Sequence, residues 1–333
     1  MSGGRGLARR PRSLGRAAAA RSLAVAAAAA LLAGCLHEPV RIAGSNVLAA
    51  AVATLDLPED AAVLVGGGDI ADCEDLAGAR ATAELIALVL ARAPEAVVFT
   101  TGDHAYPRGT PHEFTACYAP TWGRFNARTA PTPGNHDYET PGASGYFAYF
   151  DAFTTRPGAR PTGYYAFEHG GWLVVVLNSL LPVEPGSVQV RWLEDVLARS
   201  PSECVVAIWH HPRRSSGFHG YLPWDAGRDT AAFWDVLQRH GADIVLNGHD
   251  HLYERFARLD GQGRRVEDGL RQFTVGTGGA GLHPIVRQRA GSEYLTNGVY
   301  GVLVLVLRPD RYDWAFVGVD GVVHDRSRQS VAC

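Results

Sequence analysis

Five short clusters of side chains that can bind metal ions occur along the sequence, each next to a glycine or a proline. They contain carboxylates, imidazoles, an amide oxygen and a phenol: Gly68-Asp69, Gly102-Asp103-His104-Ala105-Tyr106, Gly134-Asn135-His136-Asp137, His210-His211-Pro212 and Gly248-His249-Asp250-His251. Hard and borderline donors of these kinds suit iron, zinc or manganese. They are too many for one four-coordinate zinc ion. Two metal ions that share a bridging carboxylate account for them, and such a pair can activate water.

Regular elements are expected to bring these clusters together. Four continuous apolar runs, typical of buried strands, precede four of the clusters: residues 61–65, 96–100, 204–209 and 242–246. Helical patterns lie between them over residues 77–93, 188–198 and 230–240. This alternation predicts an α/β fold with parallel strands. Because ligands bind beyond the carboxyl ends of such strands, we expect the clusters to form a single site.

The remaining chain is expected to complete one domain. Residues 172–177 predict another buried strand, and residues 272–275, 299–307 and 312–319 indicate a β-rich carboxyl-terminal part that forms a second sheet packed on the first. The clusters extend from residue 69 to residue 251 and need one another, so we predict one domain over residues 61–333. Residues 36–60 are small and apolar without a clear period, and we interpret them as a tether.

The amino terminus is typical of an export signal. Residues 1–35 contain an arginine-rich stretch, an alanine-rich apolar stretch and the sequence Leu32-Ala33-Gly34-Cys35. That tetrapeptide resembles the bacterial lipobox, so we expect Cys35 to carry lipid and to anchor an exported protein to a membrane, at the cell surface or in the periplasm. The alternative is a plain secretory signal in which Cys35 is incidental. The export route stays open.

Four cysteines remain if Cys35 carries lipid, and none of them has the spacing of a CxxC zinc site. They are Cys73, Cys117, Cys204 and Cys333. An even number in an exported chain permits two disulfides with three pairings, which the sequence does not rank. We favour a bond between Cys73 and Cys117, because both would lie in loops on the same side of the sheet.

Composition excludes some classes of protein. The 333 residues are 47% hydrophobic and 20% charged, which is ordinary for a globular protein and argues against a disordered or fibrous one. The formal net charge is −3, and it becomes −9 without the six arginines of the first 34 residues. An acidic balance argues against general nucleic-acid binding, which depends on basic groups that neutralise phosphates.

In this order the clusters resemble those of the calcineurin-like metallophosphoesterases, and within them the purple acid phosphatase-like branch, over roughly residues 61–281. The resemblance implies a four-layer αββα sandwich with two mixed β-sheets. It also implies roles for the donors: Asp69 and His251 bind the first metal ion and Asp103 bridges both ions. The second ion is bound by Asn135, His210 and His249.

One position departs from the pattern of most of the superfamily, whose first motif is Asp-x-His. Here the histidine position is Ala71, whereas Tyr106 fits the Gly-Asp-x-x-Tyr motif of the purple branch, in which a phenolate binds ferric iron. We therefore infer that Tyr106 binds the first metal ion, that this ion is Fe(III), and that the second is Fe(II), Zn or Mn. A phenol with a free pKa near 10 needs a strong Lewis acid to ionise at neutral pH. The alternative is that Tyr106 is a loop aromatic that packs beside Pro107.

The resemblance implies a phosphomonoesterase that uses a metal-bound hydroxide as its nucleophile. His136 is the first candidate for binding phosphate or protonating the leaving group, and His219 is a second one that is equally well explained as a surface residue. Arg213 and Arg214 could pair with a second anionic group of the substrate, but arginine is so common here that solvated surface is the favoured interpretation. The alternatives are a phosphodiesterase acting on nucleotide or phospholipid headgroup diesters, and a non-catalytic metal- or phosphate-binding lipoprotein. The oligomeric state is left open.

Overall fold

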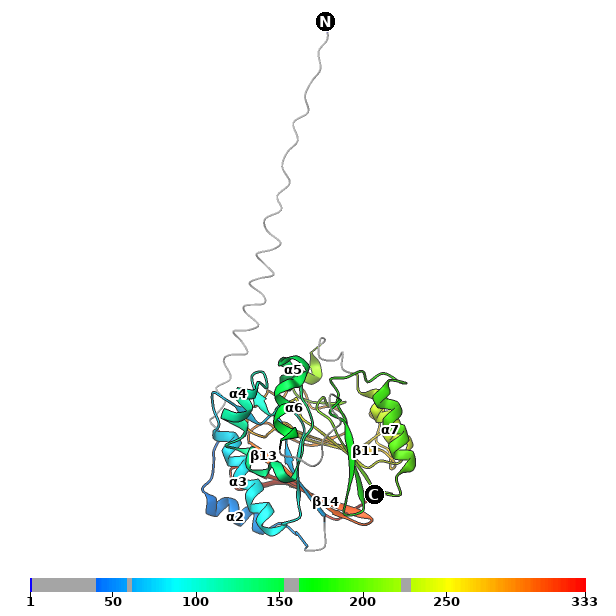
Figure 1. The fold of residues 1–333 in the computed structure, drawn as a ribbon. Helices are drawn as coiled ribbons and strands as arrows, with labels where there is room; N and C mark the ends of the chain where they lie inside the picture. Colours follow the sequence, from blue (N-terminus) through cyan, green and yellow to red (C-terminus); the bar gives the residue numbers. More distant parts are fainter. Residues whose placement is uncertain (2–39, 59–61, 153–161, 223–228) are drawn as a thin grey trace. The chain divides into compact units, whose positions relative to one another are not determined.

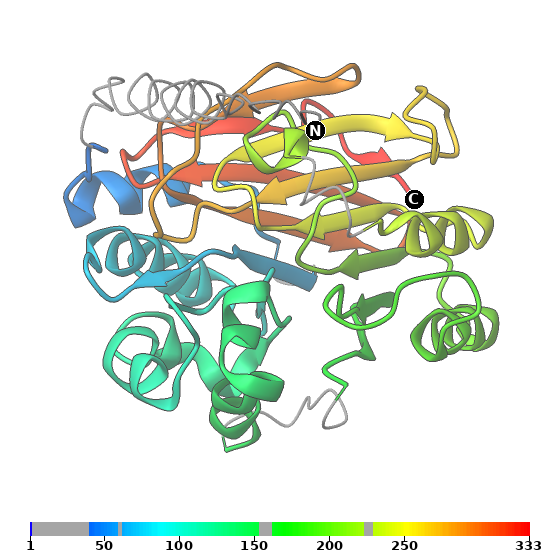
Figure 2. The same cartoon turned by 90° about the horizontal axis from the view of Figure 1, so that it is seen from above.

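Among the described residues, two seven-stranded β-sheets pack against each other between layers of helices (Figures 1 and 2). The computed structural model describes Met1 and residues 40–58, 62–152, 162–222 and 229–333. The predicted export signal and Cys35 lie outside the described residues. The unit discussed below spans Val40–Cys333, and the expected four-layer αββα sandwich with two mixed sheets is confirmed.

The first sheet combines strands from the two ends of the unit. Its order is β15-β14-β13-β1-β3-β5, and β16 also pairs with β14. Strands β1, β3 and β5 are parallel, whereas β13 runs antiparallel to β1. The strands are β1 (Ala62–Gly67), β3 (Val97–Thr100), β5 (Thr129–Ala130), β13 (Gly301–Arg308), β14 (Arg311–Gly318), β15 (Val323–Arg326) and β16 (Val331–Ala332).

The second sheet has the order β12-β10-β11-β9-β8-β7-β6. Its centre is parallel, from β7 through β8 and β9 to β11, with Val206 of β8 opposite Ile244 of β9. Antiparallel strands flank this centre. The strands are β6 (Tyr165–His169), β7 (Trp172–Val176), β8 (Val205–Ile208), β9 (Ile244–Asn247), β10 (Tyr253–Leu259), β11 (Leu270–Val275) and β12 (Ser292–Thr296).

Strands of the second sheet are apolar on both faces because each face meets a different core. Val174 and Val176 of β7 belong to the core shared with the first sheet, whereas Leu173 and Val175 belong to the core beneath the outer helices. Alternate residues of a strand point to opposite faces. This is why the run from 172 to 177 lacks the alternation of polar and apolar residues that a half-exposed strand shows.

Helices cover the outer faces of both sheets. Helices α2 (Ser45–Ala53) and α3 (Ala77–Arg92) lie on the side of the first sheet, and α7 (Val188–Arg199) and α8 (Ala231–Arg239) lie on the side of the second (Figures 1 and 2). Ser187 caps α7 by accepting a hydrogen bond from the Val190 amide. The helices expected at residues 77–93, 188–198 and 230–240 are thus confirmed.

Two expectations need correction. Residues 45–53 are not part of a tether but form α2, whose Leu48, Ala51 and Val52 are buried in the core of the first sheet. The spacing i, i+3, i+4 marks that buried face, although alanines around it obscure the period. The carboxyl-terminal strands also do not form a sheet of their own: β11 joins the second sheet, whereas β13 and β14 extend the first.

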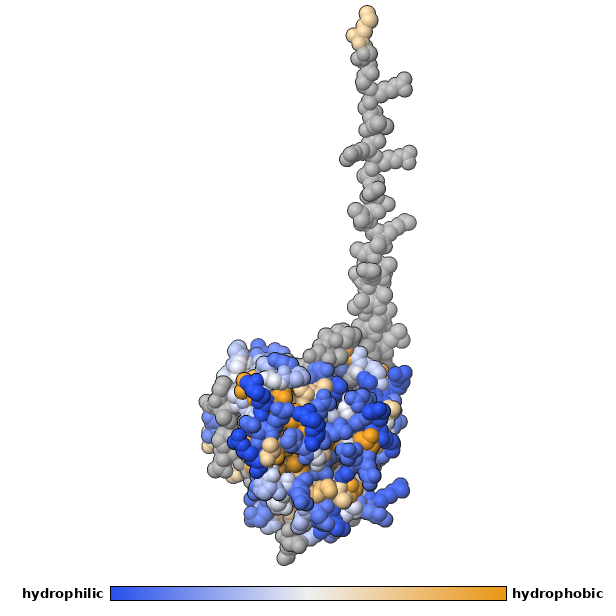
Figure 3. Space-filling view, turned by 90° about the vertical axis from the view of Figure 1, so that its right-hand side faces the viewer, coloured by the Kyte–Doolittle hydropathy of each residue, from blue (hydrophilic) through white to orange (hydrophobic). Residues whose placement is uncertain are grey.

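The face of the molecule on the side of α7 is mainly hydrophilic, with apolar residues visible between the polar ones (Figure 3). Single exposed apolar residues such as Val188, the first residue of α7, are normal on a protein surface. None of the helices in the described part of the chain is sufficiently long and apolar to span a bilayer.

Stability should depend on pH through Asp243, which lies just before β9. Its Oδ2 accepts a hydrogen bond from the Val205 amide at 3.0 Å, and Arg258 lies 3.6 Å from its Oδ1. Burial raises the pKa of Asp243 to about 6 despite these two contacts. The protonated carboxyl therefore stabilises the folded state below pH ~4, and this contribution is lost as the pH rises through about 6.

We expect Asp243→Asn to raise the free energy of unfolding at pH 7.5 by about 2 kcal/mol, because the amide keeps the hydrogen bond without the buried charge. Denaturant unfolding should show that this gain disappears at pH 4. The control is Asp195→Asn on α7, where the carboxylate is largely exposed. An equal difference between wild type and Asp243→Asn at both pH values would contradict the explanation.

Candidate metal centre

The loops after β1, β3, β8 and β9 lie against one another through backbone hydrogen bonds. The Asp69 amide donates to the Gly102 carbonyl at 3.0 Å, and the Gly248 amide donates to the His210 carbonyl at 3.0 Å. The first bond joins two loops of the first sheet, and the second joins two loops of the second sheet. The His249 amide donates to Asp69 Oδ2 at 2.9 Å and so connects the loops of the two sheets. The clusters that the sequence places after four strands therefore do meet at one edge of the sandwich.

One group of donors surrounds the phenol of Tyr106, which ends the short strand β4 (Ala105–Tyr106). Its hydroxyl oxygen lies 3.0 Å from Asp69 Oδ1, 3.2 Å from Asp103 Oδ2 and 3.0 Å from His251 Nε2. His251 Nε2 is also 3.3 Å from Asp69 Oδ1. The other three side chains predicted to hold the first metal ion thus all contact the Tyr106 hydroxyl.

A second group of donors adjoins the first. Ligand atoms of Asp103, His210 and His249 lie within 4.8 Å of one another. His210 Nε2 is 2.9 Å from the Oδ1 of Asn135, which is the first residue of α5 (Asn135–Glu139). This group contains all the side chains predicted to hold the second metal ion.

Asp103 belongs to both groups. Its Oδ2 lies 3.2 Å from the Tyr106 hydroxyl on one side and 3.2 Å from His210 Nε2 on the other. Its Oδ1 accepts a hydrogen bond from the His136 amide at 2.7 Å, which fixes the orientation of the carboxylate. A carboxylate in this position can bridge two cations.

Backbone carbonyls set the tautomers of two histidines. His210 Nδ1 lies 2.7 Å from the Thr101 carbonyl, and His251 Nδ1 lies 2.5 Å from the Gly281 carbonyl. Because a carbonyl only accepts, each Nδ1 must carry the proton. The Nε2 atoms therefore face the carboxylates, where their lone pairs would be available to a metal ion that displaces the Nε2 proton.

Tight backbone geometry explains why glycines recur in the motifs. A side chain at Gly134 would collide with the Asp103 carboxylate, and one at Gly248 would come within 2.6 Å of Asp69 Oδ2. Asp69, Asp103 and His249 themselves have positive φ angles of 59°, 54° and 69°. Non-glycine residues seldom adopt this conformation, and it is concentrated at functional sites.

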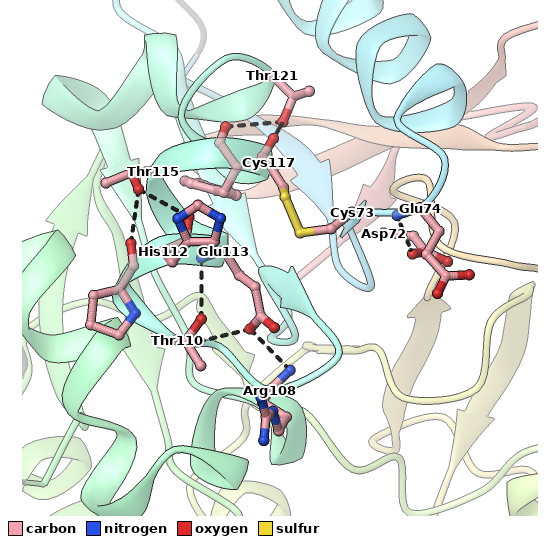
Figure 4. The surroundings of a disulfide bond; sticks show 12 residues. Asp72, Cys73, Glu74, Arg108, Thr110, His112, Glu113, Thr115, Cys117 and Thr121 are labelled. Carbon is pink, nitrogen blue, oxygen red and sulfur yellow. Dashed lines mark hydrogen bonds between the residues drawn. A yellow bond between two sulfur atoms is a disulfide. The ribbon is translucent and has the colours of Figure 1, made fainter.

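The position of Tyr106 depends on a small ladder and a disulfide. Strand β2 (Ala71–Asp72) pairs with β4, so that Ala71 lies opposite Ala105 and Asp72 lies opposite Tyr106. Cys73 then bonds to Cys117 in the π-helix η1 (Phe114–Tyr118), as Figure 4 shows. The favoured pairing is confirmed, and Cys204 bonds to Cys333. The loops after the first and second motifs are thus covalently linked.

The charges in the centre are strongly coupled. Burial raises the pKa of Tyr106 well above 10, and the carboxylates of Asp103 and Asp69 raise it further. Burial would also lower the pKa of His210, but the Asp103 carboxylate raises it to about 9. Two buried carboxylates so close together need positive charge beside them.

The donor set fits a pair of metal ions by its chemistry. Oxygen and imidazole donors of Asp69, Tyr106 and His251 form one set, those of Asn135, His210 and His249 form another, and Asp103 adjoins both. Carboxylate, phenolate and imidazole suit iron, zinc or manganese. The buried carboxylates provide the negative charge that cations neutralise.

Asp137 supports the centre without facing it. This fully buried carboxylate accepts hydrogen bonds from the amides of Asp103, His104 and Gly134 and lies 2.9 Å from His104 Nδ1. The His104 ring points away from the donors, with its Nε2 2.8 Å from the hydroxyl of Thr100. Asp137 therefore joins the second and third motifs.

The two predicted catalytic histidines lie beside the donors. The His136 ring is 4.4 Å from the Tyr106 ring, and its Nδ1 lies 2.6 Å from the Pro107 carbonyl. The His219 ring, in η4 (His219–Tyr221), is 4.2 Å from the His249 ring. Both side chains are half-buried.

His283 is a further residue of the centre and was not predicted from the sequence. Its ring stacks on that of His251 with 3.8 Å between the ring centroids and 8° between the ring planes. The His251 amide donates to His283 Nδ1, and the His283 amide donates to the His251 carbonyl. Burial lowers the pKa of His283 to about 4. His283 belongs to none of the five clusters, so the only signal was a lone histidine after a glycine-rich stretch.

Comparison with known proteins agrees with this geometry. The family model described as calcineurin-like phosphoesterase matches residues 30–253, which is more than half of the chain. The chain belongs to the calcineurin-like phosphoesterase family. The resemblance inferred from the five clusters is thereby confirmed.

Curated relatives of this chain are purple acid phosphatases. Purple acid phosphatase 15 of Arabidopsis thaliana is 30% identical over 223 residues, which cover 58% of this chain and 41% of that protein. The Fe(3+)-Zn(2+) purple acid phosphatase 12 of the same plant is 26% identical over 211 residues, or 56% of this chain and 44% of that protein. The chain thus spans about two fifths of the length of these relatives.

A solved structure shares the fold of this chain. Purple acid phosphatase PPD1 from yellow lupin seeds superposes with a TM-score of 0.66 at 18% identity, over 80% of this chain and 53% of that chain. At this identity the likeness concerns the fold alone.

Proposed function

We propose that this chain is a dinuclear-metal phosphomonoesterase of the purple acid phosphatase type. The observation that carries the proposal is the convergence of seven predicted donors into two adjoining groups that share Asp103. Asp69, Tyr106 and His251 would hold one ion, which we take to be Fe(III). Asn135, His210 and His249 would hold the second, Fe(II), Zn or Mn. The relative named as an Fe(3+)-Zn(2+) enzyme supports this choice.

When bound, a metal pair supplies Lewis acidity that activates water and neutralises charge on phosphoryl oxygens. The residues of this chain do the rest. Asp69 and Asp103 are too deeply placed among other donors to serve as nucleophiles themselves, because both are buried with their oxygens occupied. The proposed reaction therefore includes no covalent intermediate between phosphate and either aspartate.

Proton transfer to the leaving group is assigned to His136, with His219 as the second candidate. His136 Nδ1 donates a hydrogen bond to the Pro107 carbonyl at 2.6 Å, so Nε2 is the atom that gains or releases a proton. A positioned imidazole contributes about 10²–10⁴-fold in such a role. His219 lies across the centre, next to His249.

The proposal includes export. Residues 1–35 would direct secretion, and lipid on Cys35 would hold the enzyme at a membrane, at the cell surface or in the periplasm. Two disulfides among the described cysteines support an oxidising compartment. Globomycin-sensitive processing and mass spectrometry of the mature amino terminus would test the lipid on Cys35.

The test of the activity compares two chromogenic esters. We expect kcat/KM for 4-nitrophenyl phosphate to exceed that for bis(4-nitrophenyl) phosphate at least tenfold. A chelator should abolish hydrolysis, and iron with zinc should restore it. A preference for the diester would instead support the phosphodiesterase alternative, and two bound metal ions without hydrolysis would support the non-catalytic one.

A further inference from the structure

A cavity of about 270 Å³ opens beside the candidate metal centre. Its lining includes His249, His219 and His211 together with Arg213, Arg289 and Asp229. Since His249 is a predicted metal ligand, the cavity is continuous with the place where a phosphoester would react. Its volume equals that of about nine water molecules, which is room for more than one phosphoryl group.

The cavity carries more positive than negative charge. Arg213, Arg214 and Arg289 line it, and among its described lining residues Asp229 is the single carboxylate. Arg289 donates to the carbonyls of Ser215 and Gly220, and Arg214 donates to the carbonyl of Gly261. These carbonyls hold the guanidinium groups in place but carry no charge that would neutralise them.

The charges of Arg213 and Arg289 act on Arg214. Burial lowers the pKa of Arg214, and these two charges lower it further, whereas the Asp260 carboxylate opposes them. A concave surface with an excess of one charge concentrates ligands of opposite charge.

Arg213 is the residue best placed to bind an anion. Its side chain is only 27% exposed, so it forms part of the cavity wall instead of extending into solvent. Its Nη1 contacts Asp229 Oδ1 at 2.7 Å, while its Nε is buried and has no hydrogen-bond acceptor among the described residues. The Asp229 carboxylate is 63% exposed and can turn away from Arg213 into water.

We propose that this cavity binds a second anionic group of the substrate, so that the enzyme prefers phosphomonoesters that carry another phosphate or carboxylate. The inference rests on the proposed function, because it assigns a substrate class to the same centre. Guanidinium groups match phosphate and carboxylate geometry and form charge-assisted hydrogen bonds with both. The Asp229 carboxylate pairs with Arg213 until the anionic group of a substrate takes its place. The second anion thereby selects the substrate, and the metal centre hydrolyses the ester.

The test uses three esters of one carbon scaffold with the metal-loaded enzyme: glycerol 3-phosphate, 3-phosphoglycerate and 2,3-bisphosphoglycerate. We expect kcat/KM to rise at least tenfold from the first to the last. Arg213→Gln should reduce this ratio about tenfold, whereas Asp229→Asn should increase it several-fold, because the amide no longer neutralises Arg213. In the wild type, Asp229 Oδ1 accepts a hydrogen bond from the Ala231 amide, and the side-chain oxygen of asparagine can accept the same bond.

The matched control is Arg199→Gln on α7, where the arginine is 80% exposed and pairs with Asp195; it should leave all three values unchanged. Equal kcat/KM for the three esters in the wild type would overturn the inference. So would an Arg213→Gln variant that changes all three by the same factor. In either case hydrolysis itself would leave the proposed function intact.

A binding measurement separates the two proposals if no ester is hydrolysed. Calorimetry with propane-1,3-bisphosphonate and propylphosphonate should give at least tenfold tighter binding of the bisphosphonate, and Arg213→Gln should remove most of this difference. That result without hydrolysis would support the anion cavity and refute the phosphatase. Equal binding of the two phosphonates would refute the anion cavity.

Discussion

Replacement of Asp103 by alanine is expected to lower kcat/KM for 4-nitrophenyl phosphate by about 10³-fold or more and to reduce the bound metal below two ions per chain. Asp103 Oδ2 contacts both the Tyr106 hydroxyl and His210 Nε2, so its loss separates the two donor groups. Stabilisation of a phosphoryl transition state by metal ions amounts to several kcal/mol, and each 1.36 kcal/mol corresponds to tenfold in rate. Steady-state kinetics and metal analysis measure both effects.

The Asp103→Asn variant removes the negative charge of the side chain but keeps its size and shape, so it separates these two effects of Asp103→Ala. Its amide oxygen can still accept the hydrogen bond that the His136 amide now gives to Asp103 Oδ1. We expect nearly the same loss of activity with better retention of the fold. Exposed Asp195 provides the matched alanine control. An Asp103→Ala enzyme that keeps two metal ions and activity within tenfold of wild type would refute the bridging role.

The second large effect concerns colour. If Tyr106 binds Fe(III), the purified enzyme absorbs visible light through charge transfer from phenolate to iron, and Tyr106→Phe abolishes the band. Phenylalanine keeps the ring that packs against His136 and removes only the oxygen that contacts Asp69 and His251. Absorbance spectroscopy with iron analysis measures this outcome.

Tyr118 offers a matched control for the colour. It is fully buried, and its hydroxyl has no hydrogen-bond partner among the described residues, so Tyr118→Phe should keep the band. A colourless, iron-free and fully active wild type would show that Tyr106 is not an iron ligand.

Local patterns in the sequence predicted the helices, the buried strands and the donors, because each depends on neighbouring residues. The glycine before Asp103 and the one before Asn135 mark backbone that passes too close for any side chain. Glycines at such positions can be recognised in the sequence without a structure. The pairing of Cys73 with Cys117 followed from the expected position of their loops.

Long-range relations were not accessible in the same way. Nothing in residues 301–308 indicates that β13 pairs with β1, since an apolar strand fits either sheet. The helix at residues 45–53 was missed because alanine is apolar enough to hide which face is buried. The proposed roles of His283 and the partly buried Arg213 depend on contacts with residues that are distant in sequence.

The order of strands in the first sheet constrains when the protein can fold. Strand β1 has β3 on one side and β13 on the other, so its hydrogen bonds are incomplete until residues 301–308 have been synthesised and have left the ribosome. Contacts of such long sequence separation form slowly. The nascent chain must therefore avoid aggregation in an unfolded state, which is also the state in which a polypeptide can thread through a narrow translocation channel.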